Sequence, residues 1–164
     1  MVDSDRLAGR MMMICAIVFA LALLTILTAH AFEQFGGYAP CQLCLKERYA
    51  YYFAVPAALV AFFAARGENF GFARLVLVLI AIGFLLNAAL GVYHAGAEWK
   101  WWPGPSTCGG GFDLSWGQGG IVDTPVIRCD EASWWFLGLS FAGWNAVVSL
   151  GLAVIAAFGA SRKG

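Results

Sequence analysis

Two cysteines separated by two residues, Cys41 and Cys44, are the side chains in this sequence best suited to do chemistry. They follow a polar turn at residues 35–40 and precede a long apolar run. On a helix, residues i and i+3 share a face, and Arg48 joins that face one turn beyond Cys44. A helix N-terminus and a guanidinium group both favour the thiolate, which is the reactive form of cysteine. The pattern therefore predicts redox-active thiols at the beginning of a helix.

The composition predicts that this helix belongs to a membrane protein. The chain is 61% hydrophobic and only 12% charged, with a mean hydropathy of +0.74, whereas soluble domains carry about 25% charged residues. Four runs reach the roughly 20 residues that a bilayer crossing needs, at about residues 11–32, 45–65, 73–93 and 134–158. We expect an all-α, polytopic four-helix bundle that forms one membrane domain over residues 1–164, with no nucleic-acid partner.

The basic residues predict how this bundle is oriented. Six of them fall on one side of the predicted spans, namely Arg6, Arg10, Arg66, Arg74, Arg162 and Lys163. The positive-inside rule makes that side cytoplasmic, which places both termini inside and two loops, about residues 31–40 and 94–133, outside. Four basic residues fall on the outer side, namely Lys46, Arg48, Lys100 and Arg128. Tryptophans typical of a membrane interface also map there: Trp99, Trp101, Trp102, Trp116, Trp134 and Trp135.

The first apolar run has a second interpretation, as a signal peptide cleaved after residues 29–31, which would leave three spans. The run that starts at Met11 is longer than the roughly 7 to 15 residues of a signal-peptide core. We therefore expect an uncleaved first span.

The five cysteines are distributed unevenly. Cys41 and Cys44 lie at the outer face, and Cys108 and Cys129 lie in the long outer loop, so four of the five occupy the compartment in which disulfides persist. Cys15 falls inside the first span, where we expect it to be a small buried apolar residue.

Other uses of these cysteines fit less well. A structural zinc site normally takes two closely spaced pairs, whereas twenty residues separate Cys108 from Cys129, and we expect no metal. A c-type haem needs histidine where Leu45 stands. Inert disulfides that staple the outer loops remain the main alternative. Arg48, together with Pro40 near the helix start, favours reactivity.

The polar residues within the predicted spans include Glu47, Asn87 and Asn145. Glu47 could either tune the neighbouring Arg48 cation or face the lipid headgroups, and we expect the latter because charges at helix ends usually reach toward water. Asn87 and Asn145 are expected to hydrogen-bond between helices.

Two segments and the loop cysteines together resemble a known family. The run PCQLCLKERYAYY, the pair Cys108 and Cys129, and the segment RCDEASWWFLGLSFAGWN closely resemble the DsbB family, which are membrane oxidases that regenerate a periplasmic disulfide donor. The resemblance spans the whole chain and implies a bacterial inner-membrane protein with its active cysteines on the periplasmic side.

The resemblance also implies roles for individual residues. Cys41 and Cys44 would deliver electrons to a bound quinone, ubiquinone or menaquinone, with Cys44 nearest the ring as a thiolate and Arg48 stabilising the negative charge. Cys108 would be attacked by a reduced, thioredoxin-like DsbA-type partner, and Cys129 would communicate with the first pair.

His94 has two interpretations, as part of the quinone pocket or as an interfacial polar residue. The alternative to an oxidase is a non-enzymatic four-helix membrane scaffold whose disulfides are structural.

Overall fold

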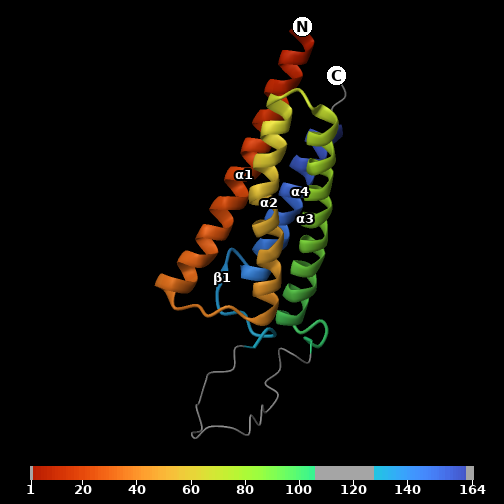
Figure 1. Ribbon diagram of the computed structural model, residues 1–164. Helices are drawn as coiled ribbons and strands as arrows, with labels where there is room; N and C mark the ends of the chain where they lie inside the picture. The colour runs from red at the N-terminus through yellow and green to blue at the C-terminus, as the bar shows by residue number, and fades with distance from the viewer. Residues whose placement is uncertain (1, 106–127, 162–164) are drawn as a thin grey trace, which may run out of the picture.

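The computed structural model describes residues 2–105 and 128–161, which form four helices and one short hairpin (Figure 1). The elements are α1 (Val2–Gly36), α2 (Gln42–Arg66), α3 (Phe70–Glu98), β1 (Trp135–Phe136), β2 (Leu139–Ser140) and α4 (Phe141–Ser161). All four helices are long and apolar enough to cross a membrane, which confirms the predicted all-α bundle. The start of α1, the α2–α3 connection and the end of α4 lie at one end of the bundle. The orientation of the termini across the membrane stays a prediction.

The helices α1, α2 and α3 extend beyond the predicted spans at both ends, whereas α4 begins at residue 141 and not at 134. The intervening residues pair as an antiparallel hairpin, with Trp135 opposite Ser140. Leu137 and Gly138 connect the strands with φ values of 50° and 81°. Two consecutive residues with positive φ are the signature of a type I′ turn, whose twist matches that of a β-hairpin. The turn therefore ends any continuation of α4 toward residue 134.

Small residues allow the helices to approach closely. One stripe of α2, with residues three or four positions apart, is buried, and it comprises Leu43, Glu47, Tyr51, Ala54, Ala58, Ala61 and Ala65. On α3, a Cβ atom at Gly91 would lie 3.0 Å from the backbone nitrogen of Ala146 in α4, so any larger residue would push the two backbones apart. Cys15 of α1 is fully buried, as predicted.

A polar network crosses the apolar core of the bundle. Asn87 Nδ2 donates hydrogen bonds to Asn145 Oδ1 at 3.3 Å and to Ser149 Oγ at 2.9 Å. The hydroxyl of Tyr51 donates to Asn145 Oδ1 at 2.7 Å. The prediction that both asparagines hydrogen-bond between helices is thereby confirmed. The network ties α2, α3 and α4 together, because none of these groups has water as an alternative partner inside a bilayer.

The C-terminal half of α1 leans away from the other helices, and the hairpin segment lies beside the resulting opening (Figure 1). Aromatic rings connect this part of α1 to the start of α4. The ring of Phe32 lies 5.1 Å from that of Phe141 and 5.5 Å from that of Trp134, measured between centroids. The divergence of α1 leaves room for a cavity beside the beginning of α2.

Candidate functional site

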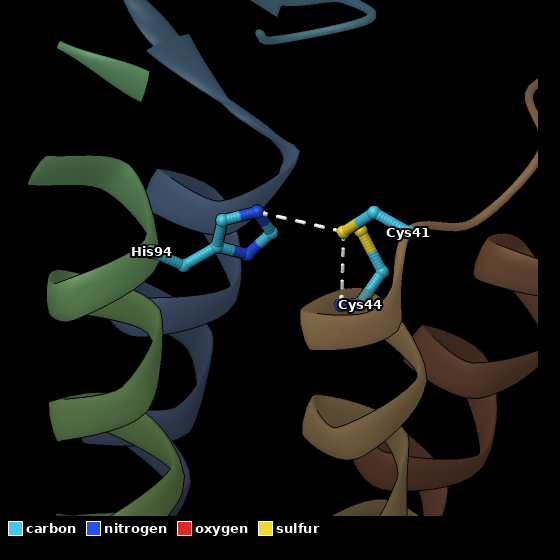
Figure 2. Close-up of side chains that lie close together, drawn as sticks. All are labelled: Cys41, Cys44 and His94. Carbon is cyan, nitrogen blue, oxygen red and sulfur yellow. Dashed lines mark hydrogen bonds between the residues drawn. The ribbon is translucent and has the colours of Figure 1, made fainter. Parts of the chain in front are cut away.

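Cys41 and Cys44 lie where the chain enters α2, and both are free thiols (Figure 2). Cys41 is the N-cap residue, with an extended backbone at φ −75° and ψ 172°. Its Sγ accepts a hydrogen bond from the backbone N–H of Cys44 at 3.2 Å. A cysteine thus occupies the position that Ser, Thr, Asp or Asn usually takes. The positive end of the helix dipole is therefore directed at the Cys41 sulfur.

His94 of α3 faces the thiol pair, although it is distant in sequence (Figure 2). Its Nε2 lies 3.6 Å from Cys41 Sγ, and its Nδ1 lies 2.9 Å from Oε1 of Glu47. An ionised carboxylate only accepts hydrogen bonds, so Nδ1 carries a proton that it donates to Glu47. His94 is 2% exposed and Glu47 is 6% exposed. The prediction that Glu47 faces the headgroups is therefore wrong, since its side chain is used to orient a buried histidine.

A second carboxylate, Glu98, lies on the other side of His94. Its Oε1 is 3.9 Å from His94 Nε2, and its Oε2 accepts a hydrogen bond from the hydroxyl of Ser140. The Ser140 Oγ also accepts from the backbone N–H of Gly143 at 3.2 Å and so caps α4. Buried carboxylates are costly inside a membrane unless they have partners. The two glutamates and His94 therefore form one mutually compensating polar cluster.

Sequence reasoning missed both glutamates as site residues, although each carries a periodic signal. Glu98 follows His94 by one helical turn, and Glu47 precedes Tyr51 by one turn. If the stripe of small residues on α2 is extended toward the N-terminus through Tyr51, it reaches Glu47, which therefore lies on the buried face of the helix.

The surroundings of Cys41 favour its thiolate. The hydrogen bond from the Cys44 thiol contributes most, and the approach of His94 adds to it, so that the pKa of Cys41 falls from 9.0 to about 4 despite the opposing effect of burial. The family resemblance implies a thiolate at Cys44, whereas in this structure the donors converge on Cys41. These donors favour Cys41 over Cys44 as the thiolate of the reduced pair.

This arrangement predicts a specific pH dependence for the thiol. We expect the ultraviolet absorbance of the Cys41 thiolate in the reduced protein to persist from neutral pH down to about pH 5. It should then disappear as the pH falls through about 4, where Cys41 becomes protonated. Replacing Cys44 with alanine removes the largest contribution and should move the transition upward toward neutral pH. A transition near pH 8.5 in the parent protein, the value of an ordinary thiol, would contradict the assignment.

A cavity of about 450 Å³ opens beside the thiols, between α1, α2 and α4. The polar residues nearest the thiols in its wall include Cys41, Cys44, Glu47, Arg48, His94 and Glu98. The rest is mainly apolar and includes Phe32, Trp134 and Phe141. Small-molecule sites typically have volumes of about 300–1,000 Å³, apolar walls and a few convergent polar groups. The cavity has the size and chemistry of a small-molecule site.

Arg48 lines this cavity and donates a hydrogen bond to Glu33 of α1. Its Nη1 donates to Oε2 of Glu33 at 2.6 Å, and the arginine side chain is 11% exposed. This bond uses one of the five N–H donors of the guanidinium group. The ion pair fixes the guanidinium at the cavity wall. Stabilisation of a Cys44 thiolate by Arg48 stays a prediction.

Cys129 packs behind the thiol pair. It is disulfide-bonded and 1% exposed, and it shares one buried cluster with Cys41 and Leu43. The predicted role of Cys108 falls outside the described residues, as does Trp116 of the predicted interfacial belt.

An ionic clamp next to Cys129 anchors this segment to the end of α3. Lys100 Nζ and Arg128 Nη2 each lie 2.8 Å from Oδ2 of Asp130. Hydrogen bonds from Arg128 and Lys100 hold the pKa of the Asp130 carboxyl well below its usual range, and the bond from Arg128 has the larger effect. Because Asp130 stays ionised across physiological pH, the clamp should keep Cys129 close to the start of α2.

Comparisons with known proteins agree with this architecture. The family model described as "Disulfide bond formation protein DsbB" matches residues 10–159. Curated relatives named disulfide bond formation protein B include one from Acidovorax sp. (strain JS42), 33% identical over 135 residues, covering 73% of this chain and 70% of the relative. Another, from Albidiferax ferrireducens, is 31% identical over 156 residues and covers 84% of this chain and 82% of the relative.

A third curated relative with the same name, from Aromatoleum aromaticum, is 30% identical over 135 residues and covers 77% of this chain and 78% of the relative. No solved structure was found to match. The family match extends through all four helices, and the family's named role suits a free thiol pair that packs beside a disulfide-bonded cysteine. The chain belongs to the DsbB family, and it is a multi-pass membrane protein with a role in disulfide bond formation.

Proposed function

We propose that this protein is a membrane thiol oxidase that re-oxidises a periplasmic, thioredoxin-like DsbA-type donor and passes the electrons to a membrane quinone. The observation that carries the proposal is the position of the free thiols Cys41 and Cys44 in the wall of a mainly apolar cavity between membrane-spanning helices. A cavity of this kind suits a small, membrane-soluble acceptor. Family membership supports thiol oxidoreductase chemistry over a purely structural scaffold.

The residues around the cavity fit such an acceptor. Arg48 retains donors beyond the one that it gives to Glu33. Asn145 also lines the cavity, and its buried Nδ2 has no hydrogen-bond partner among the described residues. We expect Arg48, Cys44 and His94 to hold the acceptor. When bound, ubiquinone or menaquinone would supply the two-electron acceptor that returns the thiols to a disulfide.

The protein's own residues account for the thiol exchange. The partner's two thiols reduce the disulfide between Cys108 and Cys129, and the partner leaves as a disulfide. The freed Cys129 thiolate attacks Cys41 in the oxidised first pair, which forms a bond between Cys41 and Cys129 and releases Cys44 as the thiolate. Cys108 then attacks Cys129, restores the loop disulfide and releases Cys41. The packing of Cys129 beside Cys41 supports this order.

His94 and Glu47 assist at the point where Cys41 leaves. A sulfur that is stabilised as a thiolate is a better leaving group, because the rate of exchange rises as the pKa of the leaving thiol falls. Glu47 orients the imidazole, and His94 lies within reach of the Cys41 sulfur. We assign Cys41 the role of exchanging with the loop, and Cys44 the role of facing the acceptor.

The same proposal places the protein in a bacterial inner membrane, with both termini cytoplasmic and the thiols on the periplasmic side. The thiol pair and the tryptophans of the hairpin segment lie at the end of the bundle opposite the start of α1 (Figure 1). Tryptophans favour a membrane–water interface, so this end would meet the periplasm.

The direct test is to record the absorbance of quinone bound to the purified protein before and after a reduced thioredoxin-like donor is added. We expect loss of the oxidised-quinone absorbance together with formation of the donor's disulfide. A structural scaffold predicts no change in either signal.

Arg48 provides a second test. We expect Arg48→Met to raise the apparent KM for quinone about tenfold to a hundredfold, since hydrogen bonds to charged groups contribute about 1.5–3 kcal/mol. Arg48→Lys should retain part of the activity, because the charge remains while the planar donor fork is lost. Steady-state turnover over a range of quinone concentrations measures both.

The control for Arg48 is Glu33→Gln, which removes the ion pair and leaves the guanidinium in place. If Glu33→Gln raises the KM as much as Arg48→Met, the pair is structural, and Arg48 has no direct role toward the quinone.

A further inference from the structure

Three potential metal ligands converge at the thiol pair. Cys41 Sγ, Cys44 Sγ and a ring nitrogen of His94 all lie within 4.8 Å of one another. Thiolate and imidazole are the donors that zinc and related soft cations prefer. The sequence offered no such site, because His94 comes from a different helix and the cysteine spacing alone argues against zinc.

The distance between Cys41 and His94 agrees with tetrahedral coordination. With Zn–S of about 2.3 Å and Zn–N of about 2.0–2.1 Å, a sulfur and a nitrogen on one tetrahedral zinc lie about 3.6 Å apart. Cys41 Sγ and His94 Nε2 are 3.6 Å apart. An ion could therefore be accommodated between them without movement of the helices that carry these residues.

The outer contacts also resemble those of a metal site. A zinc-bound histidine usually donates its other ring N–H to a carboxylate, which fixes the ring. Glu47 Oε1 lies 2.9 Å from His94 Nδ1 and takes that position. Glu98 Oε1 lies 3.9 Å from His94 Nε2, while ligands of this kind on one zinc are separated by about 3.4 Å. A small shift of Glu98 would complete a fourfold site, and the cavity provides the entry path.

We propose that the reduced protein binds one zinc-class cation through Cys41, Cys44 and His94, with Glu98 as the fourth ligand and Glu47 orienting the histidine. The ion displaces the remaining thiol protons, and no atom changes its oxidation state. Both sulfurs are then bonded to metal, so they can neither join in a disulfide nor exchange with Cys129. The oxidised pair lacks thiolates and does not bind. Zinc therefore inhibits thiol exchange by the reduced protein and leaves the oxidised protein unaffected.

The test uses the full-length protein in detergent, stripped of metal and reduced with a phosphine. Zn²⁺ is titrated in competition with a chromophoric chelator, and Co²⁺ serves as the spectroscopic probe. We expect one ion per reduced chain, a thiolate-to-cobalt charge-transfer band, and loss of both when the first pair is oxidised. Since this comparison needs no mutation, it does not depend on the folding of a variant.

Matched variants identify the ligands. Cys44→Ser and His94→Ala should each weaken Zn²⁺ binding more than tenfold, whereas Cys15→Ala and His30→Ala should not change it. Glu47→Gln should weaken binding about tenfold to a hundredfold, as removal of outer-shell partners typically does. Removal of the loop thiols, in Cys108→Ser/Cys129→Ser, should leave the affinity unchanged.

Equal binding by the oxidised and reduced proteins, or parent affinity in His94→Ala, would overturn the site. The titration involves neither quinone nor a protein partner. A failed titration therefore refutes the metal site alone, and a failed quinone reduction refutes the oxidase alone.

Discussion

Replacing Cys44 with serine is expected to reduce quinone turnover to the background rate of the quinone and the donor protein without enzyme. The two electrons leave the first thiol pair only when Cys41 and Cys44 join as a disulfide, and a serine hydroxyl cannot form that bond. The loop pair is unaffected by the substitution and should still form a mixed disulfide with the donor. Quinone absorbance and nonreducing gels measure the two reactions separately.

The matched control is Cys15→Ser, which changes a fully buried thiol of α1 that plays no part in the proposed relay. We expect it to keep the parent turnover even if it lowers stability. Turnover of Cys44→Ser near the parent rate would show that Cys44 is not the thiol that gives electrons to quinone.

The second large effect concerns the two loop cysteines, compared in a background in which Cys41 and Cys44 are both serine. A donor protein with a single active-site cysteine, carried as a mixed disulfide with nitrothiobenzoate, is the probe. Cys129→Ser leaves Cys108, which should displace the nitrothiobenzoate thiolate and form a covalent complex. Cys108→Ser leaves Cys129, which should react at least about tenfold more slowly, because reactivity requires access to the sulfur and Cys129 is buried.

Release of coloured nitrothiobenzoate gives the rates, and nonreducing gels identify the complex. Equal rates in the two variants would remove the assignment of Cys108 as the entry point. A faster reaction at Cys129 would reverse the order of the relay.

Local sequence was sufficient for the features that one helix determines by itself. The four spans were predictable because crossing a bilayer requires long uninterrupted apolar runs. The pairing of Cys41 with Cys44 was predictable because an i, i+3 spacing near a helix start fixes their proximity in any tertiary context. The burial of Cys15 was predictable because a free cysteine inside an apolar run usually behaves as a small buried apolar residue.

Contacts between two helices were predictable only where both helices carry polar side chains that need a hydrogen-bond partner inside the bilayer. Asn87 and Asn145 were expected to hydrogen-bond between helices because an amide inside a bilayer has few alternative partners. The predicted beginning of the fourth helix was wrong, because the aromatic run at residues 134–136 is as apolar as a span. The turn at Leu137 and Gly138 decides that it forms a hairpin.

The sequence by itself determined a four-span membrane protein with two neighbouring thiols at the beginning of its second helix. Only the tertiary structure decided what surrounds those thiols. The rotation of α2 buries Glu47, the contact with α3 brings His94 to Cys41, and the lean of α1 pairs Glu33 with Arg48. These neighbours depend on how small residues let the helices approach and turn against one another. The periodicity of α2 indicates which of its faces is buried, but it does not specify which residues of α1 and α3 lie opposite that face.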